Sequence, residues 1–134
     1  MIRFKVTGKP IALKRHRMTK RGFTYAPSKK DKSLFLFDCM NHIPKEPLKG
    51  ALHIEMMFIF KRPKSHFNRS GSLKSTAKKE HTSKPDIDNL VKFVLDSLSS
   101  NFFEDDRQVV SINALKVYDN ELELTDVSII SFDS

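Results

Sequence analysis

Three aspartates and one lysine are the residues of this sequence whose types and spacing could do chemistry. Asp86, Asp88 and Lys92 lie close together, and Asp106 follows in the acidic pair Asp105-Asp106. Carboxylate oxygens suit hard cations such as Mg²⁺, and two or three are enough because the ion keeps several waters. A bound cation activates water and neutralises charge in phosphoryl chemistry, and a nearby lysine can stabilise the same charge. The pattern therefore indicates metal-dependent hydrolysis of a phosphodiester.

Each of these parts also has a structural explanation. An aspartate at a helix start, such as Asp86, is more often a cap than a metal ligand. An aspartate and a lysine four positions apart, such as Asp88 and Lys92, commonly form a surface ion pair of about 0.3–0.5 kcal/mol. Asp105-Asp106 alone reads as an acidic turn. The joint occurrence of all three in a basic protein favours the chemical explanation, and spacing alone leaves both open.

A helix over residues 86–99 must position the first group. Apolar residues at helical spacing form one stripe: Ile87, Leu90, Val91, Val94, Leu95 and Leu98. Pro85 precedes this helix, and Asp86 is a competent N-cap. Asp88 and Lys92 project together from the face opposite the stripe, bordered by Asn89 and Asp96. If the next strand packs beside this helix, Asp106 at the mouth of that strand faces Asp86 and Asp88 at the N-terminal end of the helix.

The other elements follow from local periodicity. Alternation of apolar and polar residues predicts strands over 2–6, 50–60, 108–117 and 121–131, the last two joined by a tight turn at Asp119-Asn120. Residues 29–43 read as a helix that Pro44 and Pro47 end. We predict a single α+β domain over residues 1–134, with a mixed sheet of about four strands and two main helices.

Charge divides the chain into two parts. The 134 residues carry 24 Lys+Arg against 16 Asp+Glu, a net charge of +8. Residues 1–85 hold 21 of these cations and 5 acids, whereas residues 86–134 hold 3 cations and 11 acids. A basic surface attracts a polyanion, and clustered carboxylates beside it call for a cation. The balance favours nucleic acid on the basic part and a divalent metal on the acidic part, against a lysine-rich surface with no partner.

Two basic segments are the candidate DNA contacts. One is the loop over residues 14–25, and the other is a linker over residues 61–84, which we expect to be mobile because it has almost no aliphatic residues. A disordered insertion and a flap that grips DNA are both open for this linker. The candidate DNA-binding residues are Lys14, Arg15, Arg17, Lys20, Arg21, Lys61, Arg62, Lys78, Lys79 and Lys84.

The cysteine, the histidines and the apolar segments give less information about function. Cys39 is the only cysteine, so no intramolecular disulfide forms, and a reducing cytoplasmic location fits best. The longest apolar runs fall short of a membrane span, and the N-terminus lacks a signal-peptide pattern. The five histidines show no metal-ligand spacing, and His53 is expected in or beside a strand. Cys39 reads as a core residue, and Phe102-Phe103 as a core plug rather than a wedge against unstacked bases.

Three blocks in order carry a family resemblance. They are 84–92 (KPDIDNLVK), 95–98 (LDSL) and 105–109 (DDRQV). The stretch resembles the RusA family of Holliday junction resolvases, and Gly8-Lys9-Pro10 followed by Lys14-Arg15-His16-Arg17 resembles the opening of that family. The chain differs from the family at Ser99-Ser100-Asn101, where many members carry a glycine, and in a longer linker over 61–84.

The resemblance implies a small homodimeric endonuclease that uses Mg²⁺ or Mn²⁺ and makes paired symmetric nicks across a four-way DNA junction. It implies that Asp86, Asp88 and Asp106 are the essential acids that hold the metal and that Lys92 is the catalytic lysine. Asn89 and Asp105 match motif positions without an assigned role. Two alternatives stay open: a non-catalytic, structure-selective DNA-binding protein, and a metal nuclease that acts on flaps, forks or RNA.

Overall fold

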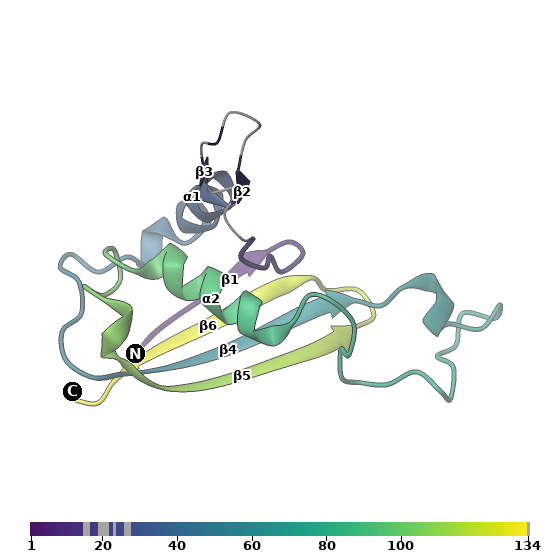
Figure 1. Ribbon diagram of the computed structural model, residues 1–134. Coiled ribbons are helices and arrows are strands. Elements are labelled where there is room, and N and C mark those ends of the chain that lie inside the picture. Colours follow the sequence, from purple (N-terminus) through teal and green to yellow (C-terminus); the bar gives the residue numbers. More distant parts are fainter. Residues whose placement is uncertain (15–16, 19–21, 23, 26–27, 134) are drawn as a thin grey trace.

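The main sheet of the protein has four strands in the order β1-β6-β4-β5. The computed structural model describes residues 1–14, 17–18, 22, 24–25 and 28–133 (Figure 1). The strands are β1 (Ile2–Thr7), β4 (Leu52–Lys61), β5 (Val109–Asp119) and β6 (Leu124–Ser131). Strand β6 is antiparallel to β1 and β4, whereas β4 and β5 are parallel. With two main helices, α1 (Lys29–Asp38) and α2 (Ile87–Leu98), this confirms the predicted α+β fold.

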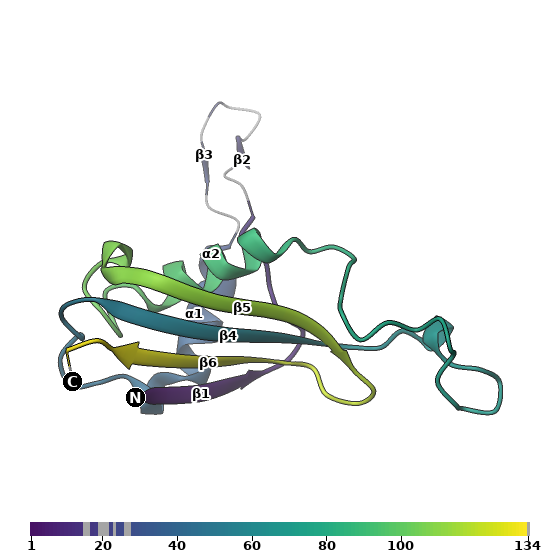
Figure 2. The ribbon, with the colours of Figure 1, turned by 90° about the horizontal axis from the view of Figure 1, so that it is seen from below.

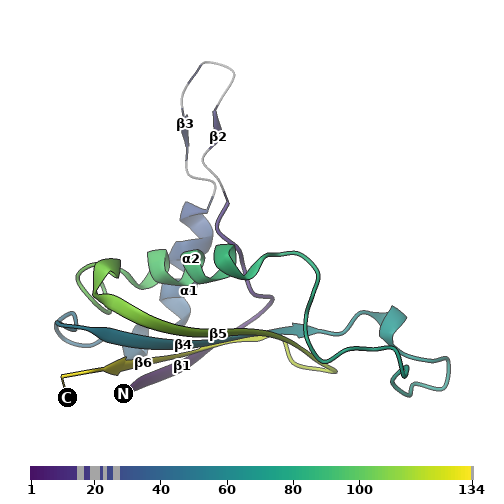
Figure 3. The same cartoon turned by 60° about the horizontal axis from the view of Figure 1, so that its bottom comes forward.

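Both helices cover one face of the sheet, as Figures 1 and 3 show. Strand β4 buries alternate residues on that face, because its apolar side chains recur with the period of a strand. The buried core residues of β4 are Leu52, Ile54, Met56, Phe58 and Phe60. The opposite face carries half-buried and exposed residues, among them Glu55 and Met57.

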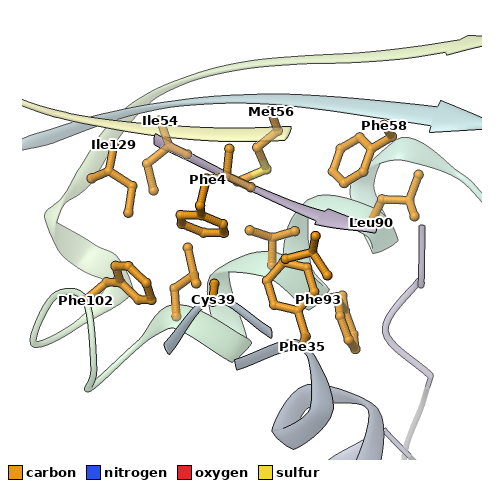
Figure 4. Packing of buried hydrophobic residues seen from close by; sticks show 14 of the residues in the cluster. Phe4, Phe35, Cys39, Ile54, Met56, Phe58, Leu90, Phe93, Phe102 and Ile129 are labelled. Carbon is orange, nitrogen blue, oxygen red and sulfur yellow. The ribbon is translucent and has the colours of Figure 1, made fainter. Parts of the chain in front are cut away.

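Helix α2 closes the core against this sheet (Figure 4). Leu90, Val94 and Leu98 are buried as the apolar stripe predicts, while Ile87, at the first turn, is 39% exposed. Phe93 is buried beside them and meets Phe35 of α1 edge to face, with ring centroids 5.6 Å apart. The buried face is therefore turned slightly from the predicted stripe, toward Phe93.

The segment after α2 completes the core. Phe102 and Phe103 are fully buried, and the Phe102 ring lies 5.3 Å from that of Phe4 in β1. The core interpretation of this pair is confirmed. Cys39 is also fully buried, as expected, and burial raises the pKa of its thiol to about 12.

The predicted tight turn between the last two strands is present, but it does not pair them. The chain does turn after Asp119, whose carboxylate accepts the N–H groups of Glu121 and Leu122 at 2.9 and 2.6 Å. The two strands are not neighbours, however, because β4 lies between β5 and β6 (Figure 2). Local turn chemistry marks where a chain reverses and does not determine which strand it pairs with next.

The first helix is shorter than predicted. It ends at Asp38, and a separate 3-10 turn, η1 (Met40–His42), continues to the residues before Pro44. The apolar spacing continues through α1 and η1, so the sequence pattern predicted them as a single helix.

The basic loop over 14–25 contains a short antiparallel pair, β2 (Arg17–Met18) and β3 (Thr24–Tyr25), where a loop was predicted. This pair projects away from the main sheet in Figures 1 and 3. At its root, the Lys14 N–H donates to the Ser28 hydroxyl at 2.8 Å. Arg15, His16, Lys20 and Arg21 lie outside the described residues.

Residues 62–85, here called the finger, connect β4 to α2 and project beyond the end of the sheet (Figures 2 and 3). The finger contains the 3-10 turn η2 (Lys64–His66) and a bridge between Phe67 and Leu73. The finger has almost no aliphatic residues, and aromatic contacts and backbone hydrogen bonds attach it to the sheet instead. Its mobility stays a prediction.

Among the described residues, no helix is both long and apolar enough to cross a lipid bilayer.

Candidate active site

The start of α2 presents two carboxylates that form neither a capping bond nor an ion pair with any described residue. Asp86 is the N-cap residue, yet its side chain makes no capping hydrogen bond. Asp88 follows within the first turn, and both residues are exposed. The positive end of the helix dipole favours negative charge at this place. The capping explanation of Asp86 therefore fails, and both carboxylates are free to bind a ligand.

The surface ion-pair explanation of Asp88 and Lys92 fails as well. The ion pairs within the described residues are Arg3–Asp126, Lys32–Asp96, His53–Glu55 and Arg107–Asp105. Asp88 and Lys92 are in none of them, although four helical positions separate their Cα atoms by only about 6 Å along the axis. An exposed ammonium thus stands one turn from an exposed carboxylate, and both are available to an incoming group.

A hollow of about 520 Å³ lies at this helix end, lined by Lys9, Lys84, Pro85, Asp86 and Asn89. Two exposed lysines therefore border the Asp86 carboxylate. Positive and negative groups together suit a phosphate that is bound through a cation and flanked by ammonium groups. Lys9 was not among the predicted site residues. Its position between Gly8 and Pro10, in the loop that leaves β1, was the signal available in the sequence.

Both basic projections are anchored near the start of α2, one to the helix itself and the other to strand β5. The Leu13 N–H, at the root of the β2–β3 pair, donates to the Asn89 carbonyl at 2.9 Å. On the other side, the Lys116 ammonium of β5 donates to the carbonyls of Ser83 and Pro85 at 2.7 and 2.6 Å. The segments expected to hold DNA thus leave the body of the protein next to the carboxylates.

An aromatic stack forms the root of the finger. The His81 ring lies 3.9 Å from that of Phe60 in a stacked arrangement and 4.8 Å from that of Tyr118. The Arg62 guanidinium lies 5.4 Å from the centroid of Tyr118 and donates to the Lys78 carbonyl at 2.8 Å. Burial, and secondarily the charge of nearby Lys116, lowers the pKa of His81. A neutral imidazole fits this stack.

Asp106 is not where the sequence led us to expect it. Its carboxylate accepts a long hydrogen bond, 3.5 Å, from the Ser99 hydroxyl at the C-terminal end of α2. A helix of 12 residues is about 18 Å long, so Asp106 and Asp86 lie at opposite ends. Within the described part of the chain, no group of three His, Cys, Asp or Glu residues could hold a metal ion. The expectation that Asp106 faces Asp86 and Asp88 at the N-terminal end of the helix is therefore wrong.

Asp105 has a structural task. Its carboxylate caps the 3-10 turn η3 (Asp106–Gln108) by accepting the Arg107 N–H at 2.8 Å, and Gln108 completes a capping box. These bonds, with the Arg107 guanidinium at 3.1 Å, lower the pKa of Asp105. The neighbouring Asp106 carboxylate is left exposed for another role.

The predicted DNA contacts fall into three groups. Lys14, Lys61, Lys78, Lys79 and Lys84 are exposed. Arg62 is half-buried, and its guanidinium is engaged at the finger root. Arg17 lies in β2, whereas Arg15, Lys20 and Arg21 are outside the described residues.

The histidines and the cysteine that the sequence analysis weighed have structural positions. His53 lies in β4, as expected, with its Nδ1 at 2.8 Å from the Ser111 hydroxyl. His81 belongs to the finger root. The raised pKa of the buried Cys39 thiol leaves it protonated near neutral pH, which does not suit a nucleophile.

Two comparisons with known proteins agree with this site. A family model described as endodeoxyribonuclease RusA matches residues 7–130, nearly the whole chain. A curated relative, the uncharacterized protein YqaN of Bacillus subtilis (strain 168), is 34% identical over 128 residues. That stretch covers 90% of this chain and 89% of the relative. The likeness includes both ends of α2 and the two basic projections.

Proposed function

Because the chain belongs to the RusA endodeoxyribonuclease family, we propose that it is a metal-dependent endonuclease that resolves four-way DNA junctions by paired symmetric nicks. The observation that carries the proposal is the pair of exposed carboxylates, Asp86 and Asp88, without a cap bond or ion pair at the start of α2. The task of such an enzyme is in DNA recombination and repair, and we assign it to the cytoplasm, where DNA is accessible and Cys39 stays reduced.

The donor set fits a hard divalent cation. Asp86, which lines the hollow, and the exposed Asp88 two residues later offer carboxylate oxygens, the kind of ligand that Mg²⁺ or Mn²⁺ takes while keeping several waters. When bound, the cation would supply Lewis-acid activation of water and neutralise charge on the phosphate. Asp106 is the third proposed ligand.

The chain's own residues orient the substrate. Water attacks the scissile phosphate in line, and the bond to the 3′ oxygen breaks to leave a 5′-phosphate and a 3′-hydroxyl, so that the proton lost by the water balances the one gained by the leaving oxygen. Lys92, one turn from Asp88, stabilises the negative charge that develops on the phosphate oxygens. Lys9 and Lys84 border the hollow and hold the neighbouring phosphates.

We propose that a second copy of the chain completes the site, because Asp106 lies at the opposite end of α2 from the other two acids. Strand β5 spans the same interval: it begins just after Asp106, and its Lys116 binds the Pro85 carbonyl next to Asp86. If two β5 strands lie antiparallel about a two-fold axis, Asp106 of each copy comes to Asp86 of the other.

The free edge of β5 suits such a dimer. Strand β5 is the last in the sheet. Among the described residues, the finger meets the free edge of β5 at its C-terminal end, where Glu80 pairs with Val117 and backbone hydrogen bonds join Arg62, Lys79 and His81 to the strand. The rest of the strand exposes large apolar side chains: Val110, Ile112 and Leu115 are 64%, 38% and 47% exposed. An open strand edge with apolar residues is a template for pairing with another chain. Two active sites related by a two-fold axis match the near two-fold symmetry of a four-way junction.

Asp88→Asn tests the proposal directly. The amide keeps the size of the side chain and removes the charge, so the variant should fail to nick a synthetic four-way junction in Mg²⁺. It should bind the junction as well as the wild type or tighter, because a charge that repels phosphate is gone. Asp38→Asn, at the exposed end of α1, is the matched control and should nick normally. Unchanged nicking by Asp88→Asn would remove this carboxylate from the mechanism.

A substrate panel separates the alternatives. Four-way junctions, flaps, forks, linear duplex and RNA are each incubated with the protein in Mg²⁺ and in EDTA. Symmetric nicking of the junction alone supports a resolvase, whereas preferred cutting of flaps, forks or RNA supports a different metal nuclease. Binding of junctions without any cutting supports the non-catalytic DNA-binding protein.

A further inference from the structure

The ammonium of Lys116 occupies an unusual place for a lysine. Lys116 is in register with Phe58 of β4, so its side chain projects toward the helix-covered face of the sheet rather than to solvent. There it is half-buried and donates to the carbonyls of Ser83 and Pro85 at 2.7 and 2.6 Å. A charged donor beside neutral carbonyls makes stronger hydrogen bonds than a neutral one does.

These two bonds hold the residues directly before Asp86. The described residues make no other hydrogen bonds to the segment over 82–85, which is mostly exposed. On either side of it, the His81 N–H donates to the Lys116 carbonyl at 3.2 Å, and the Asp86 carbonyl accepts the Leu90 N–H at 3.2 Å. One residue of β5 therefore attaches the incoming end of the finger to the sheet just before α2 begins.

We infer that Lys116 is a positioning residue, which sets the place of the Asp86 carboxylate by binding the carbonyls of Ser83 and Pro85. The inference rests on the proposed function, since it takes Asp86 as a ligand of the divalent cation. Lys116 acts through Asp86 and does not touch the substrate. It also links the finger to the site, because its bonds join the last finger residues to α2.

The first test measures cation binding by titrating the whole protein with Mn²⁺ and recording the electron paramagnetic resonance of the free ion. Lys116→Met keeps much of the side-chain length and removes the donors, so Mn²⁺ affinity should fall about 10–100-fold, the usual effect of losing a group that orients a metal ligand. Lys116→Arg keeps the charge and donors and should lose less. Lys5→Met, an exposed lysine of β1, is the matched control and should bind Mn²⁺ like the wild type.

A double variant asks whether Lys116 acts through Asp86. Asp86→Asn alone weakens Mn²⁺ binding, and adding Lys116→Met to it should cause no further loss, because the carboxylate to be positioned is already absent. If the two losses instead multiply, Lys116 acts independently of Asp86, and the inference is overturned.

The nicking assay separates this inference from the proposed function. In Lys116→Met, the Mg²⁺ concentration that gives half-maximal nicking should rise about 10-fold or more, while junction affinity in EDTA stays as in the wild type. Wild-type Mn²⁺ affinity and nicking in Lys116→Met would overturn the inference, as would an equal loss of junction binding and thermal stability that Lys116→Arg does not repair. If the wild type nicks no junction but Lys116→Met still loses Mn²⁺ affinity, the proposed function fails and the positioning role stands.

Discussion

At the scale of single residues, the site is distinguished by charged groups that lack a structural partner. Within the described part of the chain, Asp86 makes no capping bond and Asp88 and Lys92 are in no ion pair, whereas the carboxylate of Asp105 caps a turn. Residues of the same type thus separate into two classes that their spacing in the sequence does not distinguish. The contacts of each carboxylate, more than its position in a motif, indicate which ones are available for chemistry.

Lys92 provides a test at this scale. In Lys92→Met, the single-turnover nicking rate at saturating junction should fall about 100-fold or more, the usual cost of removing a donor aimed at developing charge. Junction affinity in EDTA should change little, because one ammonium among many basic groups is lost. Lys45→Met, an exposed lysine remote in sequence from the site, is the control. A loss of affinity that matches the loss of rate would make Lys92 a binding residue.

Asp105 predicts a pH effect on stability. Its pKa in the folded protein is below the ordinary value of 3.8, so its bonds to Arg107 stabilise the fold above that pH and are lost as the pH falls through the folded pKa. The free energy of unfolding of Asp105→Asn should therefore lie below that of the wild type at pH 7. The difference should shrink as the pH falls below 3.8, when measured by denaturant titration. A difference that is constant with pH would contradict the ionic role.

At the scale of elements, the turn after α2 carries local strain. Ser100 has φ 74°, in the left-handed region that favours glycine, and its N–H donates to the Phe103 carbonyl at 2.7 Å. This is the stretch in which many family members carry a glycine. The strain belongs to the connection that places Asp106 beside the C-terminal end of α2.

Ser100→Gly should therefore stabilise the protein. A side chain in the left-handed region destabilises the fold by roughly 1–2 kcal/mol, and glycine removes this cost. Glycine is also more flexible in the unfolded chain, which offsets about 0.5–1 kcal/mol of the gain. The expected gain is up to about 1.5 kcal/mol by thermal or denaturant unfolding, with unchanged nicking. Ser99→Gly, one residue earlier and without a positive φ, should destabilise instead. Equal effects of the two variants would remove the strain argument.

The elements were predictable wherever one local rule decides them. Alternation located the four strands, and helical spacing located α2, because burial of one face imposes these periods. Strand order was not predictable, since the placement of β4 between β5 and β6 depends on contacts distant in the sequence. The local structure of the finger was not predictable from its lack of aliphatic residues, because it depends on the stacking of Phe60 with His81 and on backbone pairing.

The candidate site was predictable to the same extent. Asp88 and Lys92 share a helix face because four residues make about one turn, and that needs no tertiary information. The position of Asp106 was missed, since the length of α2 separates it from Asp86. Lys116 was missed too, although a lysine at an inward position of a strand, in line with Ala114 and Tyr118, was a signal in the alternation of β5.

At the scale of the whole molecule, the separation of the acids predicts complementation between two defective variants. Asp88→Asn and Asp106→Asn should each be inactive alone. In a mixed dimer whose sites combine residues of both copies, one site collects both substitutions and the other has neither. Mixing the variants under conditions that allow subunit exchange should therefore restore nicking at one of the two strands.

The control is a mixture of Asp86→Asn with Asp88→Asn, which should restore nothing because both substitutions damage the same half of a shared site. Restored nicking in neither mixture, with exchange verified by mass spectrometry, would contradict a site shared between copies. A monomer that nicks junctions at high dilution would contradict it as well.

The way the finger is fastened has a consequence for how such nucleases diversify. Its two ends are pinned to β5, through the Arg62 N–H on the Asp119 carbonyl at 2.9 Å and the Tyr118 N–H on the Lys79 carbonyl at 2.9 Å. Its tip closes separately, at the bridge between Phe67 and Leu73. The tip is thus an exchangeable cassette: evolution can lengthen, shorten or replace it without displacing the helix that bears the carboxylates. Choice of target and bond-breaking chemistry are therefore free to change independently.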